Sequence, residues 1–462
     1  MDQGNDATGV VSSIKVAHNP ADFIYNIISD RAVQTKSALQ LQLYDSVAML
    51  DGTISLKGKA DDIIYQKALS DLVDTIGLEA NAKLINLKGK EYEEVANRIM
   101  PKLVAASRFL AKGFMSGAPI VVRFHNDGDG SAGAIALYRA FAELQKRFFT
   151  GERGVSWEMN RSIAYTLESF YADKMRFQSY ESIERPIVVI TDFGTSEESI
   201  EALNGSAEVC DIVWLDHHMP YDGFPRESVK HYINVCDFGG ESSFTAGLLT
   251  CMFAQVLAAV DVEDVKAAAL VSDYSKYADF KSEAAAMHSI ILDYLTSSSN
   301  EMHNKPKYMD AVLRDSEKSE SVFRHANGIL EETIDTGIKN VRSYRNAEGI
   351  NICVLDFAHI AKLRLDYPLP GRYSSKLQYR MESVNGGRTV TLVHYGSYIS
   401  VRTSEDVRGS IDLLEIIEKL KASSNGAIAG GGHKQAASIR TERGRIDEAI
   451  RLFLMELGVQ AD

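Results

Sequence analysis

The chain has 462 residues, of which 45% are apolar and 24% charged, and its net charge is −13. This length is too great for one core of ordinary size, so two or three domains are expected. The acidic balance argues against a protein that coats duplex DNA, because such proteins usually carry a basic surplus. If the substrate is a polyanion, the attraction must come from bound divalent ions and a confined basic patch.

No run of 18 apolar residues occurs, so no membrane span is expected. The first thirteen residues lack the basic and apolar regions of a signal peptide. The four cysteines show no CxxC spacing, which favours reduced thiols of a cytoplasmic protein over disulfides or zinc ligands. They are Cys210, Cys236, Cys251 and Cys353.

Residues 1–117 are predicted to form a helical N-terminal extension, since apolar residues recur at helical spacing over much of this stretch. Pro101 is expected to kink a helix or to mark its start. No group of residues in the extension suggests chemistry. Two alternatives remain for its role: a segment packed against the core domain, or a surface for a partner or for oligomerisation.

Residues 118–345 alternate between short apolar runs and amphipathic segments. The runs are typical of buried parallel strands, and the alternation predicts an α/β fold with right-handed crossovers. Ligands of such sheets bind beyond the carboxyl ends of the strands. The strand-like runs lie at 119–124, 187–190, 212–215 and 231–235, and the main amphipathic segments at 132–148 and 197–203.

Three clusters of carboxylates and imidazoles directly follow three of these runs, so they are expected to meet at one edge of the sheet. In the first cluster, Gly128 and Gly130 let the backbone bend so that both carboxylates can point the same way. Buried carboxylates this close repel one another unless cations neutralise them or some hold protons. The clusters are HNDGDG at 125–130, Asp192, and Asp216-His217-His218.

Carboxylate and imidazole ligands without thiolate favour Mn²⁺ or Mg²⁺ over structural zinc. Two such ions about 3.5–4 Å apart activate water for in-line attack on phosphorus. The second ion needs a further carboxylate. Asp273, after the predicted helix 265–271, is a candidate, and a plain helix-end role is its alternative.

These motifs resemble, in order and spacing, those of the DHH phosphoesterase superfamily, which includes RecJ exonucleases, oligoribonucleases and family II pyrophosphatases. GAIAGGGHKQAAS at 426–438 resembles the signature of the DHHA1 domain that follows the catalytic domain in most members. The Gly/Ser segment 238–247 is similar to a loop of archaeal-type members, and a strand-to-helix turn is a compatible interpretation. The resemblance implies a DHH catalytic domain at 118–345, including a helical connector, and a smaller α/β DHHA1 substrate-binding domain at 346–462.

The resemblance also implies two bound ions, Mn²⁺ or Mg²⁺, and a role for each motif residue. Asp192 would bridge the ions, His218 would lie near the scissile phosphate, and Asp216 would orient the histidines. Which imidazole of the pair coordinates metal is left open. The implied ligands are His125, Asp127 and Asp192 for one ion, and Asp129, Asp192, His217 and Asp273 for the other.

Two features of the C-terminal domain suit a substrate that carries phosphate. The three glycines before His433 let backbone N–H groups approach a phosphate, with a flexible loop as the alternative. By the same resemblance, Arg402 is the arginine that grips substrate phosphate, and a bidentate guanidinium suits this role. The implied substrate-binding residues are Arg402, Gly431, Gly432 and His433.

Residues 362–380 hold five basic residues against one acid, with three tyrosines between them. This pattern fits a track for single-stranded nucleic acid, and a solvated surface segment is the alternative.

The sequence therefore predicts a divalent-metal-dependent phosphodiesterase, an exonuclease on single-stranded DNA or RNA. Two alternatives stay open: an oligoribonuclease or a phosphatase of pAp or other small nucleotides, and a replication-complex scaffold related to RecJ. The motifs are most similar in style to archaeal RecJ-like nucleases, some of which associate with the replication complex GINS. A GINS-like partner is thus a further expectation.

Overall fold

The computed structural model describes residues 7–459 except 18, 20, 21, 38, 51, 52, 84, 86, 88, 299, 304, 361–366, 408, 425 and 433. The chain forms two compact units. The first comprises Met1–Leu292 and Met302–Arg314, and the second Asp293–Glu301 and Asp315–Asp462. Residues 315–345, predicted as part of the catalytic domain, belong to the second unit.

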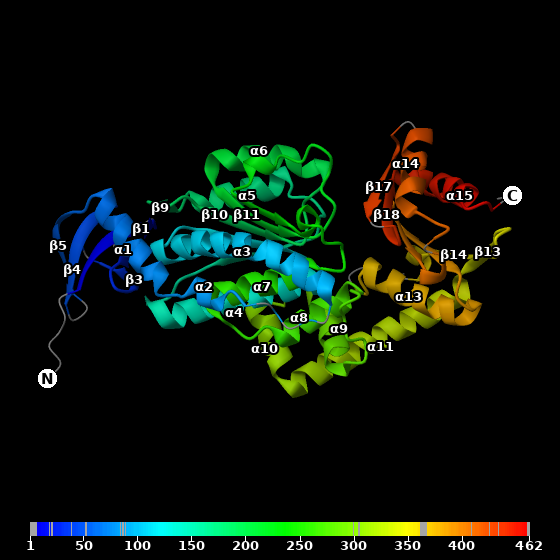
Figure 1. Cartoon of the computed structure of the whole chain (residues 1–462), viewed down its shortest axis with the longest axis horizontal. Helices are drawn as coiled ribbons and strands as arrows, with labels where there is room; N and C mark the ends of the chain where they lie inside the picture. The colour runs from blue at the N-terminus through cyan, green and yellow to red at the C-terminus, as the bar shows by residue number, and fades with distance from the viewer. Residues whose placement is uncertain are drawn as a thin grey trace. The chain divides into compact units, whose positions relative to one another are not determined.

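The first unit begins with a sheet (Figure 1). Its first three strands form an antiparallel meander, and the next two extend the sheet on the other side of β1. Two short strands pair with β3 and β1. The strands are β1 (Ala7–Lys15), β2 (Ile24–Ile28), β3 (Ala32–Lys36), β4 (Asp45–Leu50), β5 (Thr53–Lys59), β7 (Phe149–Thr150) and β9 (Tyr180–Ser182).

The prediction of a helical extension is therefore wrong for β1 to β5. Strand β2 is covered on both faces: Tyr25 and Ile27 enter the core of this sheet, while Asn26 donates to the Met115 carbonyl. A strand covered on both faces reads as a continuous apolar run, which periodicity does not separate from a buried helix. Helices follow as expected in α1 (Asp62–Asp74), α2 (Leu78–Asn81) and α3 (Lys90–Ser116), and Pro101 lies inside α3.

A parallel sheet of five strands forms the centre of the first unit, in the order β12-β11-β10-β6-β8. Four of the strands confirm the predicted ones. The fifth, β8, was missed because its sequence, SWEMN, is not an apolar run. The strands are β6 (Ile120–His125), β8 (Ser156–Asn160), β10 (Ile187–Thr191), β11 (Asp211–Asp216) and β12 (His231–Asn234).

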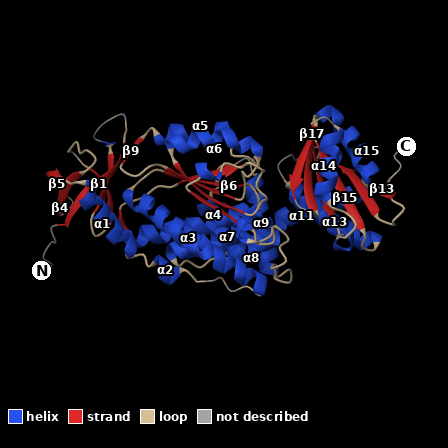
Figure 2. Cartoon of the chain, turned by 45° about the horizontal axis from the view of Figure 1, so that its top comes forward, coloured by secondary structure: helices blue, strands red, loops and turns tan. Residues whose placement is uncertain are grey.

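Helices cover both faces of this sheet (Figure 2). On one face, α5 (Leu167–Phe177) and α6 (Ile200–Val209) pack over a core that includes Trp214. On the other face lie α3, α4 (Gly128–Phe148) and α7 (Ala246–Ala258), with α8 (Glu263–Ser272) and α10 (Pro306–Arg314) packed outside α4. With both faces covered, the carboxyl edge of the strands is the place for a ligand.

The second unit holds a mixed sheet of six strands, in which β14 and β15 are parallel and the other neighbours antiparallel. Helices α14 (Leu413–Ser423) and α15 (Ile446–Glu456) close one core, and α13 (Pro370–Asn385) packs on β15 and β16 and against α11 (Ser316–Asn340). The strands are β13 (Arg342–Arg345), β14 (Asn351–Asp356), β15 (Thr389–Tyr395), β16 (Tyr398–Thr403), β17 (Ile428–Gly432) and β18 (Ala436–Thr441). The remaining helices are α9 (Glu283–Ser297) and α12 (Phe357–Ile360).

All four cysteines are free, and Cys236 alone among them is not buried. Within the described part of the chain, no helix combines the length and the apolar character that crossing a membrane requires.

Candidate metal centre

The turn after β6 places two predicted ligands side by side. Asp127 caps α4, since its Oδ1 accepts a hydrogen bond from the Gly130 N–H at 3.0 Å. Its Oδ2 lies 2.7 Å from Nδ1 of His125. A Cβ at Gly130 would lie 2.7 Å from the His125 carbonyl oxygen, so the turn closes this tightly only with glycine.

Asp129, in the first turn of α4, is fully buried and held by the start of α7. Its Oδ2 accepts a hydrogen bond from the Gly247 N–H at 3.0 Å. A Cβ at Gly247 would lie 2.6 Å from Asp129 Oδ1, so this approach also needs glycine. Thr245 caps α7. The segment 238–247 is therefore a strand-to-helix turn that also supports a site residue, as both interpretations of it allowed.

Asp192 directly follows β10 and is almost completely buried. Its φ of +69° lies in the left-handed region, which is uncommon outside glycine and concentrates at functional sites. Its Oδ2 lies 3.7 Å from His125 Nδ1, and its Oδ1 lies 3.5 Å from His217 Nε2. Asp192 thus stands between the turn after β6 and the motif after β11.

The Asp-His-His motif at the end of β11 directs its two imidazoles differently. Asp216 Oδ1 accepts a hydrogen bond from the His217 N–H at 2.7 Å and lies 2.8 Å from His218 Nδ1. His217 Nδ1 donates to the Ser242 carbonyl at 2.9 Å, which leaves Nε2 to face the carboxylates. An imidazole oriented by a carbonyl through its other nitrogen is the usual arrangement of a metal ligand. His217 therefore fits a ligand role better than the half-exposed His218.

Asp273 ends α8 as its C-terminal capping residue, and its Oδ2 lies 3.4 Å from His217 Nε2. Asp273 thus lies both at the end of a helix and beside the other predicted ligands, and its role as a metal ligand stays a prediction. The side chain is about one-third exposed, whereas Asp129 and Asp192 are buried. Asp273 therefore lies on the solvent side of the cluster.

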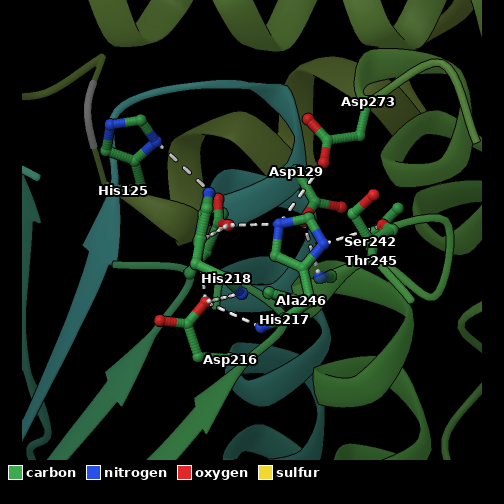
Figure 3. A network of polar contacts seen from close by, with 12 residues as sticks. His125, Asp129, Asp216, His217, His218, Ser242, Thr245, Ala246 and Asp273 are labelled. Carbon is green, nitrogen blue, oxygen red and sulfur yellow. Dashed lines mark hydrogen bonds and ion pairs between the residues drawn. The ribbon is translucent and has the colours of Figure 1, made fainter. Parts of the chain in front are cut away.

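The predicted ligands come together as two groups, in each of which the ligand atoms lie within 4.8 Å of one another. Figure 3 shows Asp129, His217 and Asp273 facing one another. Asp192 belongs to the other group and also clusters with the Asp-His-His motif. The two groups are His125, Asp127 and Asp192, and Asp129, His217 and Asp273.

The charges of the cluster favour a bound cation. Burial raises the pKa of Asp129 and of Asp192 well above the usual range, and neighbouring carboxylates raise it further. Burial would also raise the pKa of Asp127, but the His125 imidazole holds it below its usual range. One buried oxygen each of Asp129 and Asp192 accepts no hydrogen bond from any described residue. These oxygens, with imidazole and without thiolate, fit a divalent cation.

The sequence did not reveal the groups that orient these side chains. Ser242 acts through its carbonyl, and Gly247 through its N–H, so neither side chain gives a signal. Asn234 Nδ2 donates to the His218 carbonyl at 2.8 Å. The one available sign was the position of Asn234 at the end of a strand next to β11 in the sheet.

The His218–Asp216 pair makes the metal-free protein sensitive to alkali. Partial loss of hydration would lower the pKa of the half-exposed His218, but Asp216 raises it to about 9. The unfolded chain has a histidine pKa of about 6.5, so the stabilisation is complete below that pH and is lost as the pH rises through 9. We expect His218→Gln to lose less stability than wild type over this interval, measured by urea unfolding in EDTA. Equal pH dependence of the two proteins would contradict this.

The described part of the basic segment 362–380 favours the alternative to a nucleic-acid track, and the track itself stays a prediction. Residues 361–366 lie outside the described part. In the remainder, the basic side chains of α13 form ion pairs within the second unit, and two of the three tyrosines are buried. Arg372 pairs with Asp293, and both Lys376 and Arg380 pair with Glu331.

The predicted substrate-binding residues lie in the second unit. Arg402, on β16, donates to the Ser375 and Ser400 hydroxyl groups, each at 3.1 Å. Gly431 and Gly432 end β17. His433 lies outside the described residues.

Comparison with known proteins shows which known fold the chain shares. No family model matches the chain. The DHH domain of PF0399, a member of a family of ribosomal proteins, superposes with a TM-score of 0.71 and 22% identity, covering 87% of this chain and all of that one. The chain has the fold of a DHH domain. RecJ from Thermus thermophilus, in complex with Mn²⁺, superposes with a TM-score of 0.51 and 15% identity over 86% of this chain and 59% of RecJ.

Among curated proteins, MJ1198 of Methanocaldococcus jannaschii, which is uncharacterised, is 24% identical over 426 residues. The match covers 78% of this chain but 54% of MJ1198, so the chain spans about half the length of this relative. The DHH fold, related to that of RecJ and PF0399, together with the His/Asp cluster, is consistent with a metal-dependent phosphoesterase.

Proposed function

We propose that this protein is a divalent-metal-dependent phosphodiesterase that removes nucleotides from an end of single-stranded DNA or RNA. The observation that carries the proposal is the pair of ligand groups at one sheet edge, with Asp192 within reach of both. The DHH fold supports phosphoester chemistry, and the Mn²⁺ complex of RecJ supports the choice of metal. When bound, two ions activate water and neutralise charge that develops on the phosphate.

Each side chain has a proposed task in this mechanism. His125, Asp127 and Asp192 would hold one ion, and Asp129, His217 and Asp273 would hold the other, with Asp192 within reach of that group too. The Ser242 carbonyl fixes the ring of His217. Asp216 orients the ring of His218 through Nδ1, so that Nε2 can face a phosphate oxygen.

The second unit is proposed to bind the rest of the substrate. Arg402 is a half-buried planar donor beside α13, and β17 ends in glycines, whose backbone N–H groups a phosphate can approach closely. The role of His433 and the GINS-like partner stay predictions.

Replacing Arg402 with alanine is expected to raise KM for an oligonucleotide about tenfold or more and to change kcat little. A hydrogen bond to a charged group contributes about 1.5–3 kcal/mol, and this one is made away from the reacting atoms. Arg443→Ala, which removes an exposed arginine from the same unit, is the control. An unchanged KM for Arg402→Ala would contradict the proposed role of Arg402 in binding substrate phosphate.

The deciding assay incubates the protein with Mn²⁺ and end-labelled DNA and RNA oligonucleotides of several lengths, with pAp and pyrophosphate in parallel. Stepwise release of nucleotides from one end is the expected result. Turnover of pAp or pyrophosphate alone would favour a small-substrate phosphatase. No turnover of any substrate would favour the scaffold alternative.

A further inference from the structure

One face of the six-stranded sheet in the second unit brings together polar and aromatic residues that the mechanism does not use. Residues paired across neighbouring strands point to the same face. Tyr395 pairs with Tyr398, Tyr398 with Arg440, and Ser400 with Ser438. The opposite face carries the apolar residues, such as Ile399 and Ile439, that pack in the core under α14 and α15.

Helix α13 covers this polar face over β15 and part of β16, and the face is more open over β18 and β17. Over β15, Gln378 of α13 donates to the Thr389 carbonyl and accepts from the Thr391 hydroxyl. On β18 and β17, Ser438 and Ala429 are exposed. Tyr398, Arg402 and Arg440 are half-buried, and the Arg402 guanidinium is held by Ser375 of α13 and by Ser400.

A column of planar groups leads from the interior of the unit to this open face. The ring of Phe357 contacts the buried Tyr373 at 4.6 Å and Tyr395 at 6.4 Å between centroids. Tyr395 stacks on Tyr398 at 5.7 Å and an interplanar angle of 13°. The Arg440 guanidinium lies 5.0 Å from the centre of the Tyr398 ring. Packing thus fixes the outermost ring and guanidinium before any ligand arrives.

The charge of the face is unusual in a chain with a net charge of −13. Strands β15 to β18 contain two arginines, Arg402 and Arg440, and neither aspartate nor glutamate. Arg402 pairs with Ala436, which lies four residues before Arg440 on β18. At the usual rise per strand residue, the backbone positions of the two arginines are therefore about 13 Å apart along the strands. A positive strip with a stacking group at one end suits the alternating phosphates and bases of a single strand.

We propose that this strip binds a single-stranded oligonucleotide, with one phosphate at Arg402 and a neighbouring nucleotide at the Tyr398–Arg440 pair. The identity of the ligand rests on the proposed nuclease function. Tyr398 and Arg440 then give the protein a preference for strands over mononucleotides, because a mononucleotide cannot reach both ends of the strip. Ser438, exposed between them, adds a hydroxyl donor for the connecting backbone.

The test measures, by fluorescence anisotropy, the binding of a labelled single-stranded oligonucleotide of about ten nucleotides. EDTA is present so that no hydrolysis occurs. Tyr398→Ala is expected to weaken binding about tenfold, whereas Tyr398→Phe, which keeps the ring, binds like wild type. Arg440→Gln is expected to weaken binding and to reduce the slope of log affinity against log salt by about 0.7.

Two matched variants remove the same groups elsewhere in the second unit: Tyr379→Ala, exposed on α13, and Arg443→Gln, exposed after β18. Both are expected to bind like wild type. Tyr398→Ala and Arg440→Gln that bind like their controls would overturn the proposal, as would a wild-type protein that binds no oligonucleotide. Failure of the nuclease function alone looks different: the wild type binds the strand but hydrolyses nothing with Mn²⁺.

Discussion

Asp192→Asn is expected to reduce Mn²⁺-dependent hydrolysis by at least about a thousandfold, because bound metal contributes several kcal/mol to catalysis. Asp192 is the carboxylate within reach of both ligand groups, so its loss affects both ions. Asparagine is the suitable replacement, since it tolerates the left-handed backbone at this position better than most residues. The measurement is the initial rate on a single-stranded oligonucleotide.

The same substitution is expected to have no destabilising effect on the metal-free protein. Asp192 is buried beside other carboxylates, which makes its ionised form costly there. An amide of the same shape avoids that cost. In EDTA the melting temperature should therefore equal or exceed that of wild type, while the stabilisation by Mn²⁺ should shrink.

Asp211→Asn provides the control, since Asp211 starts the neighbouring strand β11 and pairs with Arg185 away from the cluster. It should keep both the activity and the response to Mn²⁺. An Asp192→Asn protein that retains hydrolysis would contradict the two-metal assignment. A protein that loses activity and also unfolds in EDTA would show that Asp192 acts in folding instead.

Arg139→Met is expected to lower the free energy of unfolding of the first unit by about 3–5 kcal/mol, the usual cost of breaking a buried ion pair. The guanidinium forms a fork with Asp264, at 2.5 and 2.7 Å, and its Nε donates to Asp310 at 2.8 Å. Arg139 is itself buried. Its loss leaves two carboxylates without their main partner.

This network joins α4, which carries Asp129, to α8, which ends at Asp273. We therefore expect Arg139→Met to weaken Mn²⁺ binding as well, although Arg139 is no ligand. Chemical unfolding and calorimetric titration with Mn²⁺ measure the two effects. The triple variant Arg139→Met, Asp264→Asn, Asp310→Asn should recover much of the stability, because it leaves neither carboxylate unpaired and because Arg314, the other partner of Asp310, is exposed to solvent. A single variant as stable as wild type would contradict the role of the network.

The parts of the fold that could be predicted were those that local sequence specifies. Strands β6, β10 and β11 are short apolar runs that end in polar residues, and parallel topology alone brings those ends to one edge. For the same reason the predicted cluster is found at that edge. The resemblance to the DHH superfamily supplied the grouping of its members, which spacing alone left open for Asp273.

The parts that could not be predicted depend on contacts between distant residues. Strand β2 was mistaken for part of a helix because α3 packs on its outer face, so that its sequence lacks the polar alternation of a half-exposed strand. The charges of α13 suggested a binding track, but their partners Glu331 and Asp293 lie 40 residues or more away in the chain. The orientation of the His217 ring depends on the backbone carbonyl of Ser242, and a backbone group cannot be recognised from the type of residue that carries it.

The chain passes between its two compact units after Leu292, after Glu301 and after Arg314. The first passage lies within helix α9, and the third follows α10, which supplies Asp310 to Arg139. The first unit is thus completed only after part of the second has been made. We expect neither unit to be separable by one cut: a chain ended after α9 lacks α10, and a chain begun at α11 lacks Asp293, the partner of Arg372. During evolution, the two units would have been inherited, lost or exchanged together.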